Sequence, residues 1–302
     1  MKSIPQITIG IPAYNEGQNL IYLLHDIQKQ KQTDWVLDNI IVALDGSNDN
    51  SAQLLSEQHI KDLVVLDDSN RKGKAQRLNE IIEKSESDIL VLLDADTKII
   101  DPSFISKLVY PLINEKVDLS SPALIPIKAK TFVEKTLECS MSMKNYIFDT
   151  YKNGDNVFTC HGPARAFSKK LYINLRFPLS TGDDAYSYMF CKKNKYSYKY
   201  VSDTAIYFRG TTTIKEHTSQ SLRFFDSIKQ MSKIFGIKFV VQNYYLPINL
   251  ILKSVIINLL KSPIYMTAYI PLVIFTFSKS LMIKRNIKPN LWMTAKSSKT
   301  LR

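Results

Sequence analysis

Apolar residues in the first hundred positions fall into four short runs, separated by stretches of helical periodicity. The runs are rich in β-branched side chains, as strands are, and lie at 7–12, 39–44, 64–66 and 89–93. The predicted helices between them occupy 17–30, 51–58 and 74–84. Strands that alternate with helices pair in parallel, and fully apolar strands are typical of sheets buried on both faces. The pattern therefore predicts an α/β fold with a mostly parallel sheet flanked by helices.

The remaining sequence is less regular. Apolar residues at 119–127 and 157–167 predict two further strands, and residues 216–235 have the two-sided pattern of an amphipathic helix. Residues 262–278 hold no charged side chain, and the segment has 17 residues, the short limit of the ~17–25 that span a bilayer. Because two prolines interrupt it, an interfacial or re-entrant segment fits as well as a span.

Charge divides the chain unevenly. The protein has 302 residues and a net charge of +12, from 40 Lys and Arg against 28 Asp and Glu. No acidic residue follows Asp226, and the twelve basic residues of 227–302 account for the whole excess. A basic tail indicates an anionic partner, a membrane or a nucleic acid. The middle of the tail is too apolar for a nucleic-acid groove, so we expect a membrane surface and no nucleic acid.

These patterns predict two parts, an α/β domain over 1–215 and an amphipathic, apolar and membrane-associated helical segment over 216–302. The N-terminus lacks the apolar stretch of a signal peptide, and the three cysteines are widely spaced without a C-x-x-C pair. We therefore expect the cytoplasmic face of a membrane, with the tail peripheral, re-entrant or forming one or two short spans. No G-x-G-x-x-G or P-loop occurs.

Polar side chains follow three of the four predicted strands: Asn15 and Glu16, Asp45, and the pair Asp94 and Asp96. Ligands of parallel α/β sheets bind beyond these carboxyl ends. Residues i and i+2 share a face, so the Asp94 and Asp96 carboxylates suit a hard divalent cation, Mg²⁺ or Mn²⁺, which would hold a diphosphate. A solvated turn at a strand end is the alternative for this pair alone.

Four motifs in order resemble family 2 glycosyltransferases, which have the GT-A fold. They are Ile11-Pro12-Ala13-Tyr14-Asn15-Glu16, Asp45-Gly46-Ser47-Asn48-Asp49-Asn50-Ser51, Gly73-Lys74-Ala75-Gln76-Arg77-Leu78-Asn79 and Asp94-Ala95-Asp96. Thr181-Gly182-Asp183-Asp184 resembles the family's Glu-Asp motif with Asp183 in the Glu position. Gln220-Ser221-Leu222-Arg223-Phe224 resembles the Gln-x-x-Arg-Trp motif of its membrane-associated members, with Phe for Trp. The resemblance covers about residues 5–235.

The resemblance implies a role for each matching position. Asp184 would be the general base, with Asp183 beside it, and Asp96 would bind the metal directly, with Asp94 near the metal and the ribose. Asp45 would contact the base of the nucleotide. The positions implied to bind the nucleotide-sugar are Pro12, Tyr14, Glu16, Asp45, Lys74, Asp94, Gln220 and Arg223. His217 is left open as a third metal ligand.

The resemblance thus implies an inverting, metal-dependent glycosyltransferase that uses a nucleotide-sugar, with a UDP-sugar favoured. Its acceptor would be a lipid, a lipid-linked glycan or a polysaccharide. Leu44 replaces a second Asp of many relatives, which weakens the choice of base. This departure, with Asp183 and Phe224, leaves a non-catalytic membrane scaffold subunit of the same fold as the alternative. A nucleotidyltransferase fits less well, since Asn15 and Glu16 stand where its Gly-rich loop would begin.

Overall fold

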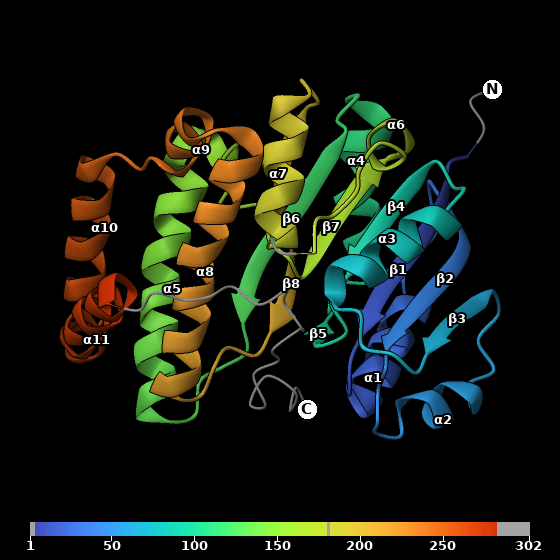
Figure 1. Cartoon of the computed structure of the whole chain (residues 1–302), viewed down its shortest axis with the longest axis horizontal. Helices are drawn as coiled ribbons and strands as arrows, with labels where there is room; N and C mark the ends of the chain where they lie inside the picture. The colour runs from blue at the N-terminus through green and yellow to red at the C-terminus, as the bar shows by residue number, and fades with distance from the viewer. Residues whose placement is uncertain (1–3, 180–181, 283–302) are drawn as a thin grey trace.

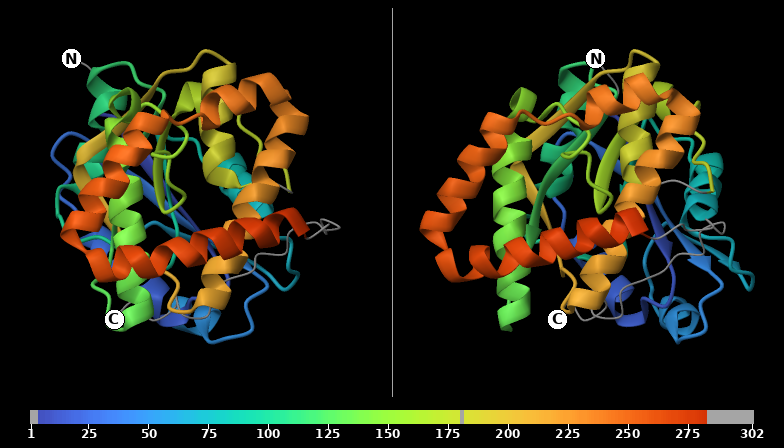
Figure 2. Two further views of the ribbon diagram at one scale, coloured as in Figure 1. Left: turned by 90° about the vertical axis from the view of Figure 1, so that its left-hand side faces the viewer. Right: turned by 60° about the vertical axis from the view of Figure 1, so that its left-hand side comes forward.

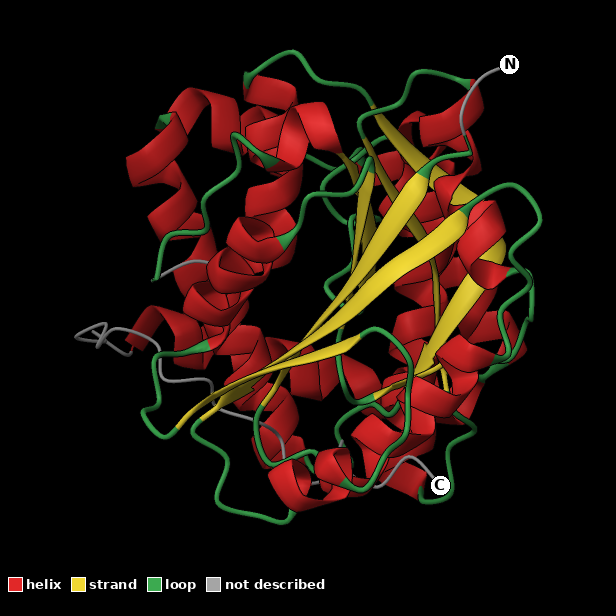
Figure 3. Ribbon diagram, turned by 90° about the vertical axis from the view of Figure 1, so that its right-hand side faces the viewer, coloured by secondary structure: helices red, strands yellow, loops and turns green. Residues whose placement is uncertain are grey.

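The computed structural model describes residues 4–179 and 182–282. Thr181 of the predicted Glu-Asp-like motif and the basic end of the tail, 283–302, lie outside the described residues. The chain builds one eight-stranded sheet in the order β3-β2-β1-β4-β7-β6-β8-β5. Figure 3 shows this twisted sheet crossing the molecule between helices on both sides.

The first half of the sheet confirms the four predicted strands. Its members pair in parallel in the order β3-β2-β1-β4. The strands are β1 (Gln6–Ala13), β2 (Val36–Asp45), β3 (Leu63–Asp68) and β4 (Ile89–Leu93). Their connecting helices, α1 (Gly17–Gln28), α2 (Ser51–Ser56) and α3 (Lys74–Lys84), also lie where helical periodicity predicted them. Strand runs and helical spacing were therefore sufficient signals over this region.

The second half of the sheet is mixed. β7 (Ala164–Ser168) runs antiparallel to β4 and to β6 (Leu119–Pro126). β8 (Tyr198–Phe208) pairs in parallel with β6 and antiparallel with the short β5 (Thr97–Lys98). β8 was not predicted, because its alternation of buried and exposed residues is irregular.

The predicted strand at 157–167 is wrong for residues 157–163. These residues form a loop whose backbone groups are satisfied by side chains rather than by a neighbouring strand. The Phe158 N–H donates to Oδ1 of Asn156 at 3.1 Å, and the Thr159 carbonyl oxygen accepts from the Ser121 hydroxyl at 2.6 Å. Such local bonds compete with strand pairing, and only Ala164–Ser168 joins the sheet.

Two hydrophobic clusters cover the two faces of the sheet. On one face, α1 and α4 (Phe104–Asn114) pack against β1, β2 and β4. On the other, α3, α6 (Lys169–Tyr172) and α7 (Asp183–Lys193) cover the sheet together with Met231, Phe235 and Val240 from further along the chain. The sheet edge between these layers carries the loops that follow β1, β2 and β4.

A helix from the middle of the chain and the helices that follow β8 lie together against one side of this body (Figure 1). The helices are α5 (Phe132–Thr150), which leads into the 3₁₀ turn η1 (Tyr151–Gly154), α8 (Ile214–Phe235), α9 (Ile237–Tyr244), α10 (Ile248–Lys261) and α11 (Pro263–Met282). α8 confirms the predicted amphipathic helix and starts two residues earlier, because the Thr213 hydroxyl accepts from the Glu216 N–H. Figure 2 shows α11 running across α5 with α10 beside it, and both helices contact α5.

By length and composition, one helical stretch among the described residues could cross a membrane. It is Ile237–Lys261, of which 11% of the most apolar window is buried. The stretch consists of α9 and α10 and is interrupted at 245–247.

Gly10 determines how closely α3 approaches β1. A Cβ atom built on Gly10 would lie 2.4 Å from Cγ2 of Ile81 and 2.9 Å from Cδ2 of Leu92. We expect Gly10→Ala to lower the free energy of unfolding by about 1–3 kcal/mol through overpacking, measured by urea denaturation. Gly210→Ala is the matched control, because nothing lies within 4 Å of a Cβ there; equal losses in both variants would contradict this account.

Candidate active site

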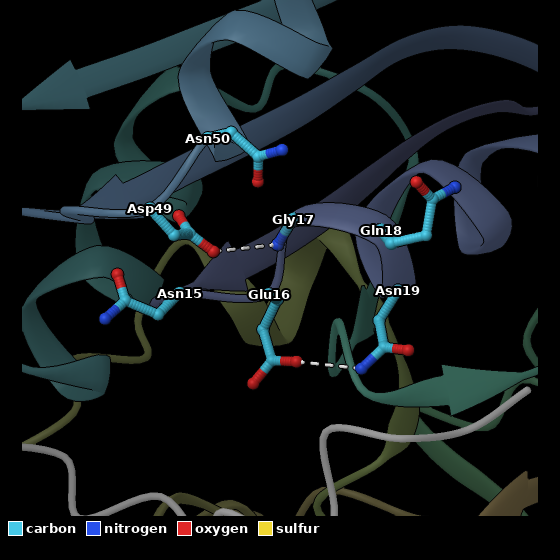
Figure 4. A pocket seen from close by; sticks show the side chains of 7 residues that line it. All are labelled: Asn15, Glu16, Gly17, Gln18, Asn19, Asp49 and Asn50. Carbon is cyan, nitrogen blue, oxygen red and sulfur yellow. Dashed lines mark hydrogen bonds between the residues drawn. The ribbon is translucent and has the colours of Figure 1, made fainter.

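The loops after β1 and β2 hold each other through polar side chains. The Asn15 amide donates to Oδ1 of Asn48 at 2.7 Å, and the Asn48 N–H donates to Oδ1 of Asn15 at 2.9 Å. At the start of α1, the Gly17 N–H donates to Oγ of Ser51 at 2.9 Å. Figure 4 shows the polar pocket between these loops, lined by 15–19 and 49–50. Two of the predicted motifs thus meet at the sheet edge.

Asp45, at the end of β2, is fully buried and holds the loop that begins α3. Its carboxylate accepts from the N–H groups of Lys72 (2.8 Å) and Gly73 (2.9 Å) and from Nε of Arg77 (3.1 Å). Gly73 has φ of 91°, a conformation that favours glycine. A direct contact with a nucleotide base, which the resemblance implied, is therefore not open to Asp45 unless this loop moves.

The other residues expected near a nucleotide lie around this loop. The Tyr14 ring is covered by the Arg71 guanidinium, whose Cζ lies 3.7 Å from the ring centroid. Glu16 is nearly buried, and its Oε2 accepts from the Asn19 amide at 3.1 Å. Pro12 is buried within β1 and pairs with Ala43 of β2, so it shapes the strand end rather than presenting a polar group.

A second cluster joins the ends of β4, β7, α3 and α7. Nζ of Lys74 lies 2.6 Å from Oδ1 of Asp94 and 3.2 Å from Oδ2 of Asp183. Arg165, fully buried on β7, forms an ion pair with the same Asp183 oxygen, and its NH1 donates to Oγ of Ser187 at 2.9 Å. Two cations therefore converge on Asp183, and one of them also reaches Asp94.

This arrangement shifts the pKa values of the two neighbouring carboxyl groups of α7, Asp183 and Asp184, in opposite directions. Burial acts to raise the pKa of Asp183, but the Lys74 ammonium and the Arg165 guanidinium outweigh it and lower that pKa to about 2. The pKa of Asp184 is raised, first by burial and then by the charge of Asp183. Asp183 is thus a permanently ionised partner of two cations, whereas Asp184 holds a more basic carboxylate.

Asp184 and Asp94 both lie beside Gly162. A Cβ atom built on Gly162 would lie 3.8 Å from Oδ2 of Asp94 and 4.0 Å from Oδ2 of Asp184. The two carboxylates therefore border the same glycine. The neighbouring imidazole of His161 has a pKa lowered to about 4 by burial, so it is neutral at physiological pH and adds no positive charge here.

The pair predicted to bind a metal is half-buried and electrostatically coupled. Burial raises the pKa of Asp94 to about 6, against the lowering effect of Lys74 and with a contribution from Asp183 and Asp96. Within residues 4–179 and 182–282, no three His, Cys, Asp or Glu side chains gather to hold a metal alone. Two carboxylates still fit Mg²⁺ or Mn²⁺, because these ions commonly complete their shell with water and substrate phosphates.

Two further site residues were predicted on α8. Gln220 and Arg223 are exposed, while Ser227, one turn beyond, accepts from the Gly182 N–H at 3.3 Å and so connects α8 to the start of α7. His217 packs edge-on against Tyr269 of α11, with ring centroids 6.3 Å apart. It is not brought into a metal-binding group with Asp94 and Asp96 among the described residues.

The sequence of this chain matches one known protein family over most of the residues that form the site. The profile of the family described as glycosyl transferase family 2 matches residues 8–176, more than half of the chain. The chain belongs to glycosyl transferase family 2. The matched range includes the Asp45, Lys74 and Asp94 loops and Arg165 and ends before α7, so Asp183 and Asp184 lie outside it.

Individual relatives and solved structures are consistent with the assignment of this protein to family 2. It is 33% identical over 92 residues to poly-β-1,6-N-acetyl-D-glucosamine synthase of Staphylococcus aureus, over 30% of this chain but only 22% of that relative's length. The mannosyltransferase PcManGT of Pyrobaculum calidifontis, solved with GDP-Man and Mn²⁺, has a TM-score of 0.63 at 17% identity, covering 94% of this chain and 89% of its own. Glucosyl-3-phosphoglycerate synthase of Mycobacterium tuberculosis, solved with Mn²⁺ and UDP, has a TM-score of 0.55 at 17% identity, covering 78% and 80%. These structures share the fold, which confirms the GT-A prediction.

Sequence reasoning missed three arginines that contact residues of the predicted motifs in this family 2 site. Arg165, Arg77 and Arg71 each contact an acidic or aromatic residue of the predicted motifs. Arg77 lay inside the Gly73–Asn79 motif and could have been noticed there. Arg165 had no such signal, because a single Arg within an apolar strand does not show which loop it faces.

The two α7 carboxylates should respond oppositely to neutralisation. Asp183→Asn leaves buried Arg165 without its charged partner and should lower the free energy of unfolding by about 3–5 kcal/mol at pH 7. Asp184→Asn should leave it unchanged or slightly higher, because the fold already disfavours the ionised form. Urea denaturation measures both, and equal losses would refute the assignment.

This difference should depend on pH in a defined direction. The folded pKa of Asp183 is lowered, so its stabilisation is present above the unfolded value of about 3.9 and is lost as the pH falls towards about 2. The gap between wild type and Asp183→Asn should therefore narrow between pH 5 and pH 2. A gap that stayed constant over this range would contradict the ionised state of Asp183.

Proposed function

We propose that the chain is an inverting, metal-dependent glycosyltransferase that moves a sugar from a nucleotide-sugar to a lipid, lipid-linked glycan or polysaccharide at the cytoplasmic face of a membrane. The observation that carries the proposal is that Asp184, whose pKa is raised, and Asp94, which is bound to Lys74, both lie beside Gly162. In this scheme residues 1–215 are the catalytic domain and 216–302 the membrane-associated part.

Asp184 is the general base in this proposal. Its carboxylate takes the proton of an acceptor hydroxyl, whose oxygen then attacks the anomeric carbon while the bond to the nucleotide diphosphate breaks. A raised pKa makes the carboxylate a better proton acceptor, provided that it stays ionised at the working pH. Because Asp183 is held by Arg165 and Lys74, its position and charge are fixed, and it supports Asp184 rather than exchanging protons itself.

The positive charge needed by the leaving diphosphate comes from two sources in this proposal. Lys74 lies between Asp94 and Asp183, where its ammonium is held at the edge of the site. Asp96 and Asp94 would hold Mg²⁺ or Mn²⁺, and the bound ion would neutralise charge that develops on the diphosphate. The ions recorded with PcManGT and with glucosyl-3-phosphoglycerate synthase support this choice.

The donor in this proposal is a UDP-sugar, the nucleotide class recorded with glucosyl-3-phosphoglycerate synthase. Tyr14 and Glu16 are proposed to line the nucleotide, and Gln220 and Arg223 to meet the diphosphate or the acceptor once substrate is present. The exposed position of the last two on α8 leaves them accessible to an incoming acceptor.

The decisive test is release of free nucleotide across a panel of sugar donors, with UDP-sugars and GDP-mannose included. Wild type should turn over at least one donor, and Asp184→Asn should lower kcat by about 10²–10⁴ because the base is lost. Calorimetry should show nearly unchanged donor binding in Asp184→Asn. Retained turnover in this variant would overturn the role of Asp184, and no turnover by wild type with any donor would favour a scaffold.

Metal dependence has its own test in donor binding. Calorimetry with and without Mn²⁺ should show tighter donor binding with the ion in wild type, and Asp96→Ala should abolish that difference. Asp68→Ala is a control, because that carboxylate is bound by Lys72 at the end of β3. An undiminished Mn²⁺ effect in Asp96→Ala would mean that the ion is held elsewhere.

A further inference from the structure

The helix α10 turns polar side chains towards the protein and apolar side chains towards its surroundings. The side that faces α5 carries Ser254 and Asn258, both buried; the Ser254 hydroxyl donates to the carbonyl oxygen of Met143 at 2.8 Å, and the Asn258 amide donates to that of Ser254 at 2.9 Å. The opposite side carries aliphatic residues with 55–79% of their surface exposed, namely Ile248, Leu252, Ile256 and Leu260. A helix at a water surface normally has the reverse pattern.

The neighbouring helices extend this surface. On α11, Met266, Tyr269 and Thr276 are buried towards the protein, with Met266 and Tyr269 packed on α5. We call the exposed apolar side chains of these three helices the apolar face. It consists of the outward side of α10, Ile237 and Val241 of α9, and Ile264, Ile270, Val273, Ile274, Phe275 and Phe277 of α11. An apolar surface of this extent on a soluble protein marks an interaction site.

Charge on the same helices selects the partner. Lys238, Lys253, Lys261 and Lys279 lie on α9, α10 and α11. All four side chains are exposed, and each of the first three directly follows a residue of the apolar face. No acidic residue occurs anywhere in 227–302. A face that is apolar and purely basic complements a bilayer with anionic headgroups, since lysines reach the headgroups while aliphatic groups enter the acyl region.

The geometry favours helices that lie in the membrane plane. α10 has 14 residues and is therefore roughly 21 Å long, shorter than the ~30 Å hydrocarbon core. Its inner side is fixed to α5 through Ser254, and α11 lies across α5 (Figure 2). Spanning the bilayer would require both helices to leave these contacts, whereas lying flat uses the apolar face as it stands.

The same helices reach the proposed active site. Phe277 of the apolar face contacts Phe225 of α8, with ring centroids 6.3 Å apart, and Ser227 of α8 accepts from the Gly182 N–H beside Asp183. α9 ends at Tyr244, whose hydroxyl is buried and whose pKa is raised by burial and by the charge of Asp184. The surface and the base are therefore linked through one layer of helix.

We propose that α9, α10 and α11 form a monotopic docking surface that lies flat in the interface of an anionic phospholipid bilayer. This inference deepens the proposed function. It rests on that function only for what docking would achieve, which is to bring Asp184 to a membrane-bound acceptor.

Vesicle co-flotation of the full chain tests the surface. Wild type should float with vesicles that contain phosphatidylglycerol and bind pure phosphatidylcholine at least tenfold more weakly. The double variant Ile256→Glu with Phe275→Glu should lower binding at least tenfold. The matched control is Ile173→Glu, a side chain 53% exposed that directly follows α6, and it should bind as wild type does. Figure 1 shows α6 well separated from α10.

Three results would overturn the proposal. They are absence of flotation by wild type, unchanged flotation of the double variant, and a dimer in light scattering that the double variant abolishes while wild type ignores vesicles. Nucleotide release from the donor panel is measured on the same samples. Wild type that releases nucleotide but does not float counts against docking alone, and wild type that floats but releases no nucleotide counts against the glycosyltransferase proposal alone.

The depth of two labels separates a flat helix from a spanning one. The three native cysteines are buried, so single cysteines introduced as Ile248→Cys and Leu260→Cys can carry an environment-sensitive fluorophore. Quenching by lipids labelled at shallow and deep positions should place both ends of α10 at the same shallow depth. Ends that differ by about 18 Å, the length of twelve residues of helix, would show a span and overturn the flat orientation.

Discussion

The buried ion network of Arg165, Asp183, Lys74 and Asp94 is the constraint on which the site depends. An isolated charge on any of these groups would be costly in the interior, and each is stable there only because its partners are present. The four residues come from β7, α7, α3 and β4, so the network also fixes how those elements meet. Removing one charge therefore alters packing and electrostatics together.

This constraint gives two adjacent aspartates different chemistry. The cations are directed at Asp183, and Asp184 experiences mainly burial and the negative charge of its neighbour. One carboxyl group is thereby held ionised while the other becomes a stronger base. Gly162 borders both Asp184 and Asp94.

The C-terminal helices show the opposite distribution of polarity. The body buries mainly apolar side chains, whereas α10 turns Ser254 and Asn258 inward, and both α10 and α11 present apolar side chains outward. These two patterns suit two different surroundings, water and the bilayer interface. α8 lies between the two parts, and the proposed function places it between the membrane-bound acceptor and Asp184.

Sequence alone determined the first four strands, their helices, the amphipathic helix at 216–235 and the acidic residues at the strand ends. These features are local, since strand runs, helical spacing and turn residues are set by neighbours along the chain. Only the tertiary structure decided that 157–163 forms a loop, that Asp45 is buried beneath Arg77, and that Arg165 distinguishes Asp183 from Asp184. It also decided which side of α10 faces outward. Each of these depends on residues far apart in sequence that meet only when the sheet is assembled, and no local pattern carries that information.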